Sequence, residues 1–253
     1  VITQQYKRLN GGAQPRADLM KAILLNGAMD LVKPAPDYTH GFGEKDVYPS
    51  LQMLDSAAYM ANNISNGDSQ SFTINVAPGT GQVKVMLYWA DVPASTASSK
   101  QLVNDLDLTV KDASGITHLP LVLNATHDRV NDVAIEGTDH INNVEQVTIN
   151  TPVPGTYTVK VKGYSIPFGP QHYVVTYDRI PKALHLTYPL GGEQLLSAST
   201  PFDTIRVFWD AVTDGNTFKV ETSQDNGTNW FTISDHVPAG DRHCDFLPVG
   251  LST

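Results

Sequence analysis

The sequence predicts a mainly β protein, in which one or two helices precede a jelly roll or β-sandwich and a smaller β unit follows it. Helical periodicity is confined to about the first 60 residues. From Ser71 onward apolar residues recur at every second position, which is the period of a half-buried strand. Pro-Gly and Ser-Gly turn signals separate these segments. Seven or eight short strands without helices between them are typical of sandwiches and jelly rolls.

The clearest helix is expected over residues 15–31. Leu19, Ala22 and Ile23 recur at three- and four-residue spacing, which places them on one stripe of a helix. Pro34 prevents the helix from continuing. Such a stripe must be buried, and one or two helices cannot bury it by themselves. We expect its partner to be a protein domain that precedes this chain.

Two shorter helical segments flank that helix. Residues 1–9 are expected to be the end of an earlier helix, because the sequence Asn-Gly-Gly at 10–12 is a typical terminator. Residues 48–60 are expected to form a second short helix, because Leu51, Leu54 and Ala58 follow the helical period.

The strongest strand signal is the alternation in residues 83–89. Val83, Val85 and Leu87 alternate with Lys84 and Met86, so one face is expected to be buried and the other solvated. Further strands are predicted at residues 72–76, 106–110, 119–123, 144–149, 157–161 and 173–177.

Residues 180–182 read as a linker to a second β unit. Strands recur after it at residues 184–188, 205–209, 218–221 and 230–233. These are few strands for an immunoglobulin- or fibronectin-like sandwich, so we expect a truncated one. The predicted domains are therefore a helical segment (residues 1–60), a β-sandwich (61–180) and a small β module (183–253).

Composition excludes several classes of function. The net charge is −9 with 17 Lys and Arg and no basic run, so nucleic acid and anionic membranes are not expected partners. No stretch approaches the roughly 20 apolar residues of a membrane span. Cys244 is the one cysteine, so an intrachain disulfide is excluded. Residues 1–10 do not resemble a signal peptide.

No motif of catalytic chemistry is present. The eight histidines lie outside any nucleophile or base motif, and neither G-x-S-x-G nor H-E-x-x-H occurs. We therefore assign no catalytic residue and no organic cofactor, and expect this chain alone to be inactive as an enzyme.

The best candidate for a metal site lies in residues 103–108. Alternation places Asp105 and Asp107 on one strand face, where two carboxylates repel each other unless they are solvated or bridged by a cation. Asp91, after the preceding strand, and Asn104 could add oxygen ligands for calcium. The alternative interpretation is that these side chains lie on a solvated face or cap turns.

Other polar and aromatic features have structural explanations beside functional ones. The loop at 127–132 could hold a cation, although Asn and Asp usually bond their own backbone in turns. Residues 223–230 resemble an Asp-box hairpin, with Trp230 packed under the turn. Five aromatic residues could form a carbohydrate surface, although most are expected in the core: Tyr164, Phe168, Tyr173, Trp209 and Trp230.

The N-terminal residues resemble a known family. Residues 4–7 (QQYK) and 15–28 (PRADLMKAILLNGA) look like the helices that follow the catalytic serine of a subtilisin-like serine protease, or subtilase. Residues 36–46 (PDYTHGFGEKD) are similar to the closing turn of that catalytic domain.

A second set of motifs resembles the jelly-roll accessory domain of large bacterial subtilases. It comprises residues 84–94, 100–108, 139–147, 154–159 and 163–173, in the family's order. The resemblance covers roughly residues 1–178, and residues from 184 onward are similar to immunoglobulin-like modules of bacterial exoenzymes.

The resemblance implies a parent protein that is a secreted bacterial serine endopeptidase with an Asp/His/Ser triad upstream of this chain. Its own protease domain and its protein substrates would be the partners. Calcium is common in such accessory domains, which supports the proposed site. The alternative function is a carbohydrate- or cell-surface-binding β-sandwich of an exported protein, and a structural spacer is a third.

Overall fold

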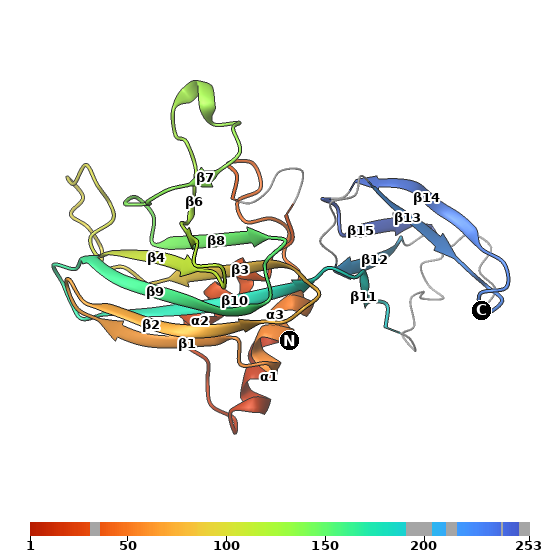
Figure 1. Ribbon diagram of the computed structural model, residues 1–253, viewed down its shortest axis with the longest axis horizontal. Coiled ribbons are helices and arrows are strands. Elements are labelled where there is room, and N and C mark those ends of the chain that lie inside the picture. Colours follow the sequence, from red (N-terminus) through yellow and green to blue (C-terminus); the bar gives the residue numbers. More distant parts are fainter. Residues whose placement is uncertain (31–35, 191–203, 211–216, 239, 248–253) are drawn as a thin grey trace. The chain divides into compact units, whose positions relative to one another are not determined.

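A computed structural model describes residues 1–30, 36–190, 204–210, 217–238 and 240–247 (Figure 1). The chain divides into two compact units, Val1–Arg179 and Ile180–Thr253. The division falls at the predicted linker, and the helical segment shares the first unit with the β-sandwich. Among the helices of the described residues, none is both long enough and apolar enough to cross a membrane.

The helical segment contains α1 (Ile2–Leu9), α2 (Ala17–Asn26) and α3 (Val47–Asp55). The predicted helix over 15–31 is shorter at both ends, and Gly27 caps it. The predicted helix over 48–60 is wrong in its last turn. It ends at Asp55, the chain reverses at Ala57 with φ 49°, and Tyr59 already begins a strand.

The sandwich of the first unit consists of two antiparallel sheets. The helix-covered sheet has the order β1 (Tyr59–Ile64), β10 (Gln171–Pro181), β3 (Thr80–Tyr88) and β8 (Val144–Asn150). The second sheet has the order β2 (Ser69–Val76), β9 (Gly155–Ser165), β4 (Asp105–Lys111) and β5 (Thr117–His118). Most successive strands alternate between the two sheets, which is the connectivity of a jelly roll and confirms the predicted fold class.

Two short strands and one turn of helix complete the first unit. β6 (Leu121–Val122) pairs with β7 (Ile135–Glu136), and the 3₁₀ turn η1 (His127–Arg129) lies between them. This is the 127–132 loop considered as a cation site. Within it Arg129 Nη1 lies 3.4 Å from Asp132 Oδ2, so an exposed ion pair occupies that carboxylate.

The main core lies between the two sheets and follows the predicted alternation. Leu106, Leu108 and Val110 of β4 face Val83, Val85 and Leu87 of β3 across this core, and each is at most 1% exposed. Trp89, which is also fully buried, closes one end. Full burial of each such side chain contributes about 1.5–3 kcal/mol to the free energy of unfolding.

The expectation that β3 has one solvated face is wrong. Lys84, Met86 and Tyr88, which point away from the main core, are 5%, 0% and 7% exposed. A second apolar cluster explains this burial, because Leu19 and Ile23 of α2 pack against this outer side of the sheet (Figure 1). The apolar stripe of α2 therefore has its partner within the chain, and the expectation that an upstream domain covers it is also wrong.

A buried polar network fixes the end of α2 on the sheet. Lys84 Nζ donates to the carbonyl oxygen of Ala28 at 2.9 Å, just beyond the helix C-terminus, where a positive charge is favourable. Asn26 Oδ1 accepts from Gln146 Nε2 of β8 at 3.0 Å. A buried lysine is thus tolerated because its ammonium group has a carbonyl partner.

The described residues of the second unit form two smaller antiparallel sheets. One has the order β11 (His185–Tyr188), β12 (Ile205–Asp210) and β15 (His243–Phe246), and the other pairs β13 (Thr217–Thr222) with β14 (Phe231–Pro238). Trp209, Phe218, Val237 and Cys244 form its apolar cluster. The four predicted strands are all found, and β15 is an additional one.

Removing the contact between α2 and the sheet should destabilise the first unit. We expect Ile23→Ala to lower the free energy of unfolding by about 2–5 kcal/mol, because Ile23 is fully buried. The matched control Leu9→Ala, on α1 and 44% exposed, should cost less than about 1 kcal/mol. Urea unfolding followed by circular dichroism measures both. Equal, small losses would show that α2 does not pack on the sandwich.

Candidate functional site

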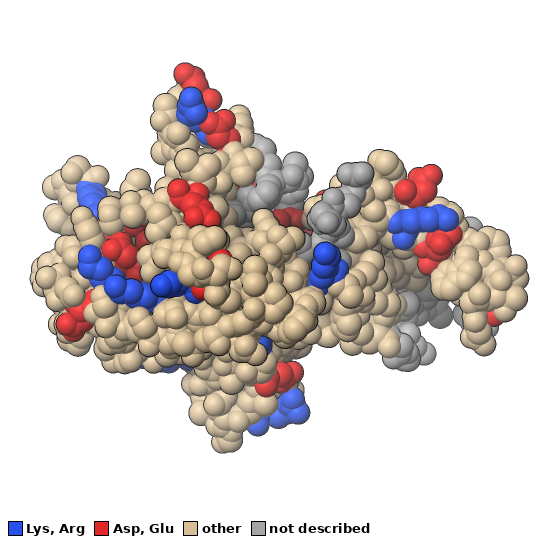
Figure 2. Space-filling model, in the orientation of Figure 1, with Lys and Arg blue, Asp and Glu red and all other residues tan. Residues whose placement is uncertain are grey.

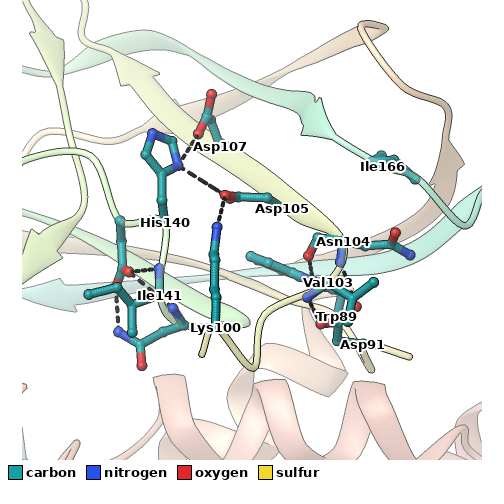
Figure 3. Close-up of polar contacts among 12 residues, drawn as sticks. Trp89, Asp91, Lys100, Val103, Asn104, Asp105, Asp107, His140, Ile141 and Ile166 are labelled. Carbon is teal, nitrogen blue, oxygen red and sulfur yellow. Dashed lines mark hydrogen bonds and ion pairs between the residues drawn. The ribbon is translucent and has the colours of Figure 1, made fainter. Parts of the chain in front are cut away.

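The four residues predicted as calcium ligands are close in sequence but have different partners: Asp91 and Asn104 bond to other parts of the chain, whereas Asp105 and Asp107 belong to a charged cluster (Figure 3). Asp91 follows β3, and its carboxylate accepts the backbone N–H groups of Val92, Val103 and Asn104 at 2.7–2.9 Å. Three such bonds close the base of the 91–103 loop. The oxygens of Asp91 therefore stabilise a turn, as in the alternative interpretation of the sequence.

Asn104 is fully buried and joins three segments of the first unit. Its Nδ2 donates to the carbonyl oxygen of Phe168 and to Gln171 Oε1, each at 2.7 Å. Its Oδ1 accepts the Phe168 N–H at 3.2 Å, and its own carbonyl oxygen accepts from Trp89 Nε1 at 2.8 Å. All of its polar atoms named here have protein partners, so Asn104 is a structural residue in this arrangement.

Asp105 and Asp107 share one side of β4, as the alternation predicts, and His140 joins them. Its Nδ1 lies 3.2 Å from Asp105 Oδ2 and 3.7 Å from Asp107 Oδ1. One ligand atom from each of the three residues lies within 4.8 Å of the others. The ammonium group of Lys100 is 3.1 Å from Asp105 Oδ2 on the other side (Figure 3).

Charge balance accounts for much of this cluster. Asp105 is 1% exposed and is compensated by Lys100, together with His140 when that imidazole is protonated. Burial raises the pKa of Asp107 above its usual value, the charge of His140 opposes this, and the repulsion from Asp105 adds to it. A cation could replace the Lys100 ammonium, whose side chain is half exposed. Two carboxylates and one imidazole nitrogen supply fewer oxygen ligands than calcium usually takes.

A tight turn and an aromatic contact hold His140 in place. Asp139 Oδ1 accepts the N–H groups of Ile141 and Asn142 at 2.8 and 3.1 Å, which fixes the loop before β8. The imidazole of His140 stacks on the ring of Tyr164 at 4.2 Å between centroids. His140 was one of eight histidines assigned no role. The sequence Asp-His-Ile-Asn-Asn at 139–143, a histidine within a polar turn, is the feature that could have pointed to a role for His140.

Glu145 is a buried acid that sequence reasoning missed. It is 3% exposed, and its Oε2 accepts the N–H of Leu108 on β4 at 2.6 Å. Its Oε1 has no hydrogen-bond partner. Burial raises the pKa of Glu145 to about 9, and the nearby charge of Asp107 adds to this. The carboxyl group is therefore protonated at neutral pH and bridges the two sheets at their edge.

The remaining sequence candidates fall into two groups. Tyr173 and Trp209 are 1% and 3% exposed and belong to the two cores, whereas Tyr164, Phe168 and Trp230 are 48%, 67% and 59% exposed. The hairpin at 223–230 is a structural turn, in which Asp225 accepts from the Asn229 N–H at 2.8 Å. Trp230 lies against this turn at Gly227. Its Nε1 donates to the Gly227 carbonyl oxygen, and its ring stays exposed.

Comparison with known proteins gives weak similarity to protease-associated chains. No protein-family model matches. A "Serine protease/ABC transporter B family protein tagA" of Dictyostelium discoideum is 28% identical over 195 residues, which are 69% of this chain and 11% of that protein. Its relative tagD is 27% identical over 156 residues, or 56% of this chain and 8% of that protein. The chain thus spans about a tenth of the length of these curated relatives.

Among solved structures, the pre-peptidase C-terminal domain of a collagenase from Bacillus anthracis is similar with a TM-score of 0.28 and 13% identity. That match covers 47% of this chain and 87% of the collagenase domain.

The buried carboxyl group of Glu145 should make stability depend on pH. In the unfolded chain this group ionises above its ordinary pKa of 4.5, whereas in the folded chain it stays protonated up to about 9. Its contribution is therefore fully present below pH 4.5 and is lost as the pH rises toward 9, at up to about 1.4 kcal/mol per pH unit.

We expect Glu145→Gln, which keeps an acceptor for the Leu108 N–H, to have nearly the same unfolding free energy as the wild type near pH 4.5. At pH 8 the variant should be the more stable by more than about 1 kcal/mol. Urea unfolding at the two pH values measures the difference. A variant that loses stability equally at both would contradict a protonated Glu145.

Single substitutions can test which of the predicted residues bind calcium. If calcium binds at Asp105, Asp107 and His140, it raises the melting temperature of the wild type by mass action. Asp107→Asn should remove that increase. Asp91→Asn should lower the melting temperature both with and without calcium, because it weakens charged hydrogen bonds to backbone N–H groups. The expected loss in the free energy of unfolding is about 1.5–3 kcal/mol.

Differential scanning calorimetry in 5 mM calcium chloride and in EDTA measures these effects. Identical wild-type melting temperatures in the two solutions would argue against a calcium site in this cluster.

Proposed function

We propose that this chain is the non-catalytic C-terminal part of a secreted bacterial subtilisin-like serine endopeptidase, whose jelly roll stabilises the protease domain. The observation that carries the proposal is the 28% identity, over 69% of the chain, to a Dictyostelium discoideum protein named "Serine protease/ABC transporter B family protein tagA". The order of the subtilase-like motifs, from residues 4–7 through 163–173, supports it. The triad would be supplied by the preceding part of the parent protein.

The helical segment offers a physical route by which the sandwich would stabilise a preceding domain. α2 and α3 bury Ile23 and Met53 against the helix-covered sheet. α1 has no buried residue, and only its half-buried Ile2 and Tyr6 pack against this cluster. A protease domain that packs on the remaining surface of α1 and α2 would thus be joined to the sandwich through elements common to both.

In the proposed role the protein would lie outside the cell. Its partners would be its own protease domain and, through that domain, the protein substrates of the parent. The sandwich would act on substrate access by its position beside the protease domain, without contributing a reacting group. The chain's acidic composition is compatible with this role, since no binding of nucleic acid is required.

The proposal predicts where peptidase activity resides. The purified chain should not hydrolyse casein, whereas the protein extended upstream should do so and should be inhibited by a serine-directed phosphonate. In the extended protein, Ile23→Ala should shorten the half-life of activity at raised temperature at least several-fold relative to Ile116→Ala, an exposed position outside the helical segment, because Ile23→Ala loosens the shared helices.

Two results would contradict the proposal. One is hydrolysis of casein by the chain alone. The other is an upstream coding sequence without a serine-protease domain, which would leave the similarity to protease-associated proteins without functional meaning.

A further inference from the structure

The outward side of the second sheet differs from that of its partner sheet. The helices pack on the helix-covered sheet, while the second sheet presents side chains that are exposed or half-buried. Hydroxyl groups dominate this surface: Ser69, Ser71 and Thr73 on β2, Thr109 on β4, and Thr156 and Thr158 on β9. The alternate residues of the same strands lie in the main core. We call this outward side the hydroxyl face.

Three lysines lie among these hydroxyl groups. The register pairs Lys160 with Thr109 and Lys111 with Thr158, so the two lysines lie on neighbouring strands and are offset by two residues. Lys162 follows Lys160 on β9 at the next outward position. The attachment points of the three side chains therefore form an oblique row, with about 7–8 Å between Lys111 and Lys160 and about 7 Å between Lys160 and Lys162.

The hydroxyl face carries charge of the opposite sign to the whole molecule. Two carboxylates lie on the same side of β4: Asp105, which has Lys100 and His140 as partners, and Asp107, which lies opposite Lys162 in the register. Lys111 and Lys160 instead lie opposite hydroxyl residues of the neighbouring strands. The chain as a whole has a net charge of −9. Figure 2 shows basic side chains over β4 and β9, with acidic side chains among them. Lys111 and Lys160, which have no carboxylate opposite them in the register, give the face a local attraction for anions that the composition alone does not suggest.

We propose that the hydroxyl face binds a carboxylated polysaccharide, with the lysine row pairing with uronate carboxylates and the Ser and Thr hydroxyls contacting sugar hydroxyls. A flat sheet face suits an extended polymer. Exposed Tyr164 marks one end of the row, because Lys162 Nζ lies 5.5 Å from its ring centroid and His140 stacks against the ring.

The chemistry of the face favours this ligand over other polyanions. Each strand of duplex DNA carries a phosphate about every 3.4 Å along the helix axis, and neutralising several of them needs a larger basic surface than three lysines. Sulfate and phosphate groups are best matched by the fork of an arginine guanidinium, whereas the cations here are lysines. Single positive charges beside hydroxyl groups match a polymer of acidic sugars, in which each sugar carries one carboxylate and several hydroxyl groups. The inference does not depend on the protease proposal.

Affinity electrophoresis and calorimetry with polygalacturonate test the proposal on the intact chain. We expect the wild type to be retarded at 50 mM salt, and the retardation to weaken as salt is raised. Lys111→Glu/Lys160→Glu should weaken binding at least tenfold. The matched charge reversal Lys45→Glu/Lys182→Glu, at exposed positions outside the face, should bind like the wild type.

Two further variants separate sugar recognition from charge alone. Lys111→Arg/Lys160→Arg should retain binding. Thr73→Ala/Thr158→Ala should weaken it several-fold without changing its salt dependence, because only hydroxyl contacts are removed. Melting curves confirm that each variant is folded.

The proposal is overturned if the wild type is not retarded by polygalacturonate, or if both charge reversals weaken binding equally. Tighter binding to dextran sulfate, to single-stranded DNA or to anionic vesicles would also overturn it, as would equal retardation by neutral dextran.

Discussion

The burial of β3 on both sides organises the first unit of this protein. One side of the strand faces the interior of the jelly roll, and the other is covered by α2. Because Lys84 lies on the helix side, its ammonium group must find a partner away from water, and the Ala28 carbonyl oxygen supplies it. The position of the helical segment, the end of α2 and the order of the sheet thus depend on one another. The helices behave as a third layer of the sandwich.

This arrangement changes how the helical segment relates to a protease. A stripe such as that of Leu19 and Ile23 would be free to contact a catalytic domain if it were unpaired, but it is already buried on the sandwich. The surfaces that remain for a preceding domain are those of α1 and the outer side of α2. Stabilisation of a protease domain would then act through helices held firmly by the jelly roll, which is a more rigid coupling than a flexible linker provides.

Much of the fold was predictable because alternation and turns report directly on strands. The main exceptions have identifiable causes. β1 was missed because three successive residues of this edge strand, at 61–63, are exposed and show no alternation. The side of β3 that carries Lys84 was expected to face solvent because lysine is usually exposed. Lys84 is buried because its ammonium group donates to the carbonyl oxygen of Ala28. Helix α3 was extended too far because Tyr59 and Met60 are as apolar as the residues of the preceding turn.

The candidate site was predictable only in part. The alternation correctly places Asp105 and Asp107 on one face, but residue type does not reveal that Asp91 and Asn104 use their polar atoms on the chain itself. His140 reaches Asp105 across 35 positions of sequence, a proximity that only the jelly-roll connectivity creates. The burial and hydrogen bond of Glu145 likewise depend on Leu108 in the middle of β4, 37 positions earlier in the sequence, which a local pattern cannot show.

Native-state hydrogen exchange tests most directly whether the helices and the jelly roll unfold together as one cooperative unit. The account predicts that the slowest amides of α2 exchange with the same opening free energy as those of β3, since neither can open without exposing the other. Amides of α2 that exchange at the rate of an unfolded peptide, while those of β3 stay protected, would contradict it.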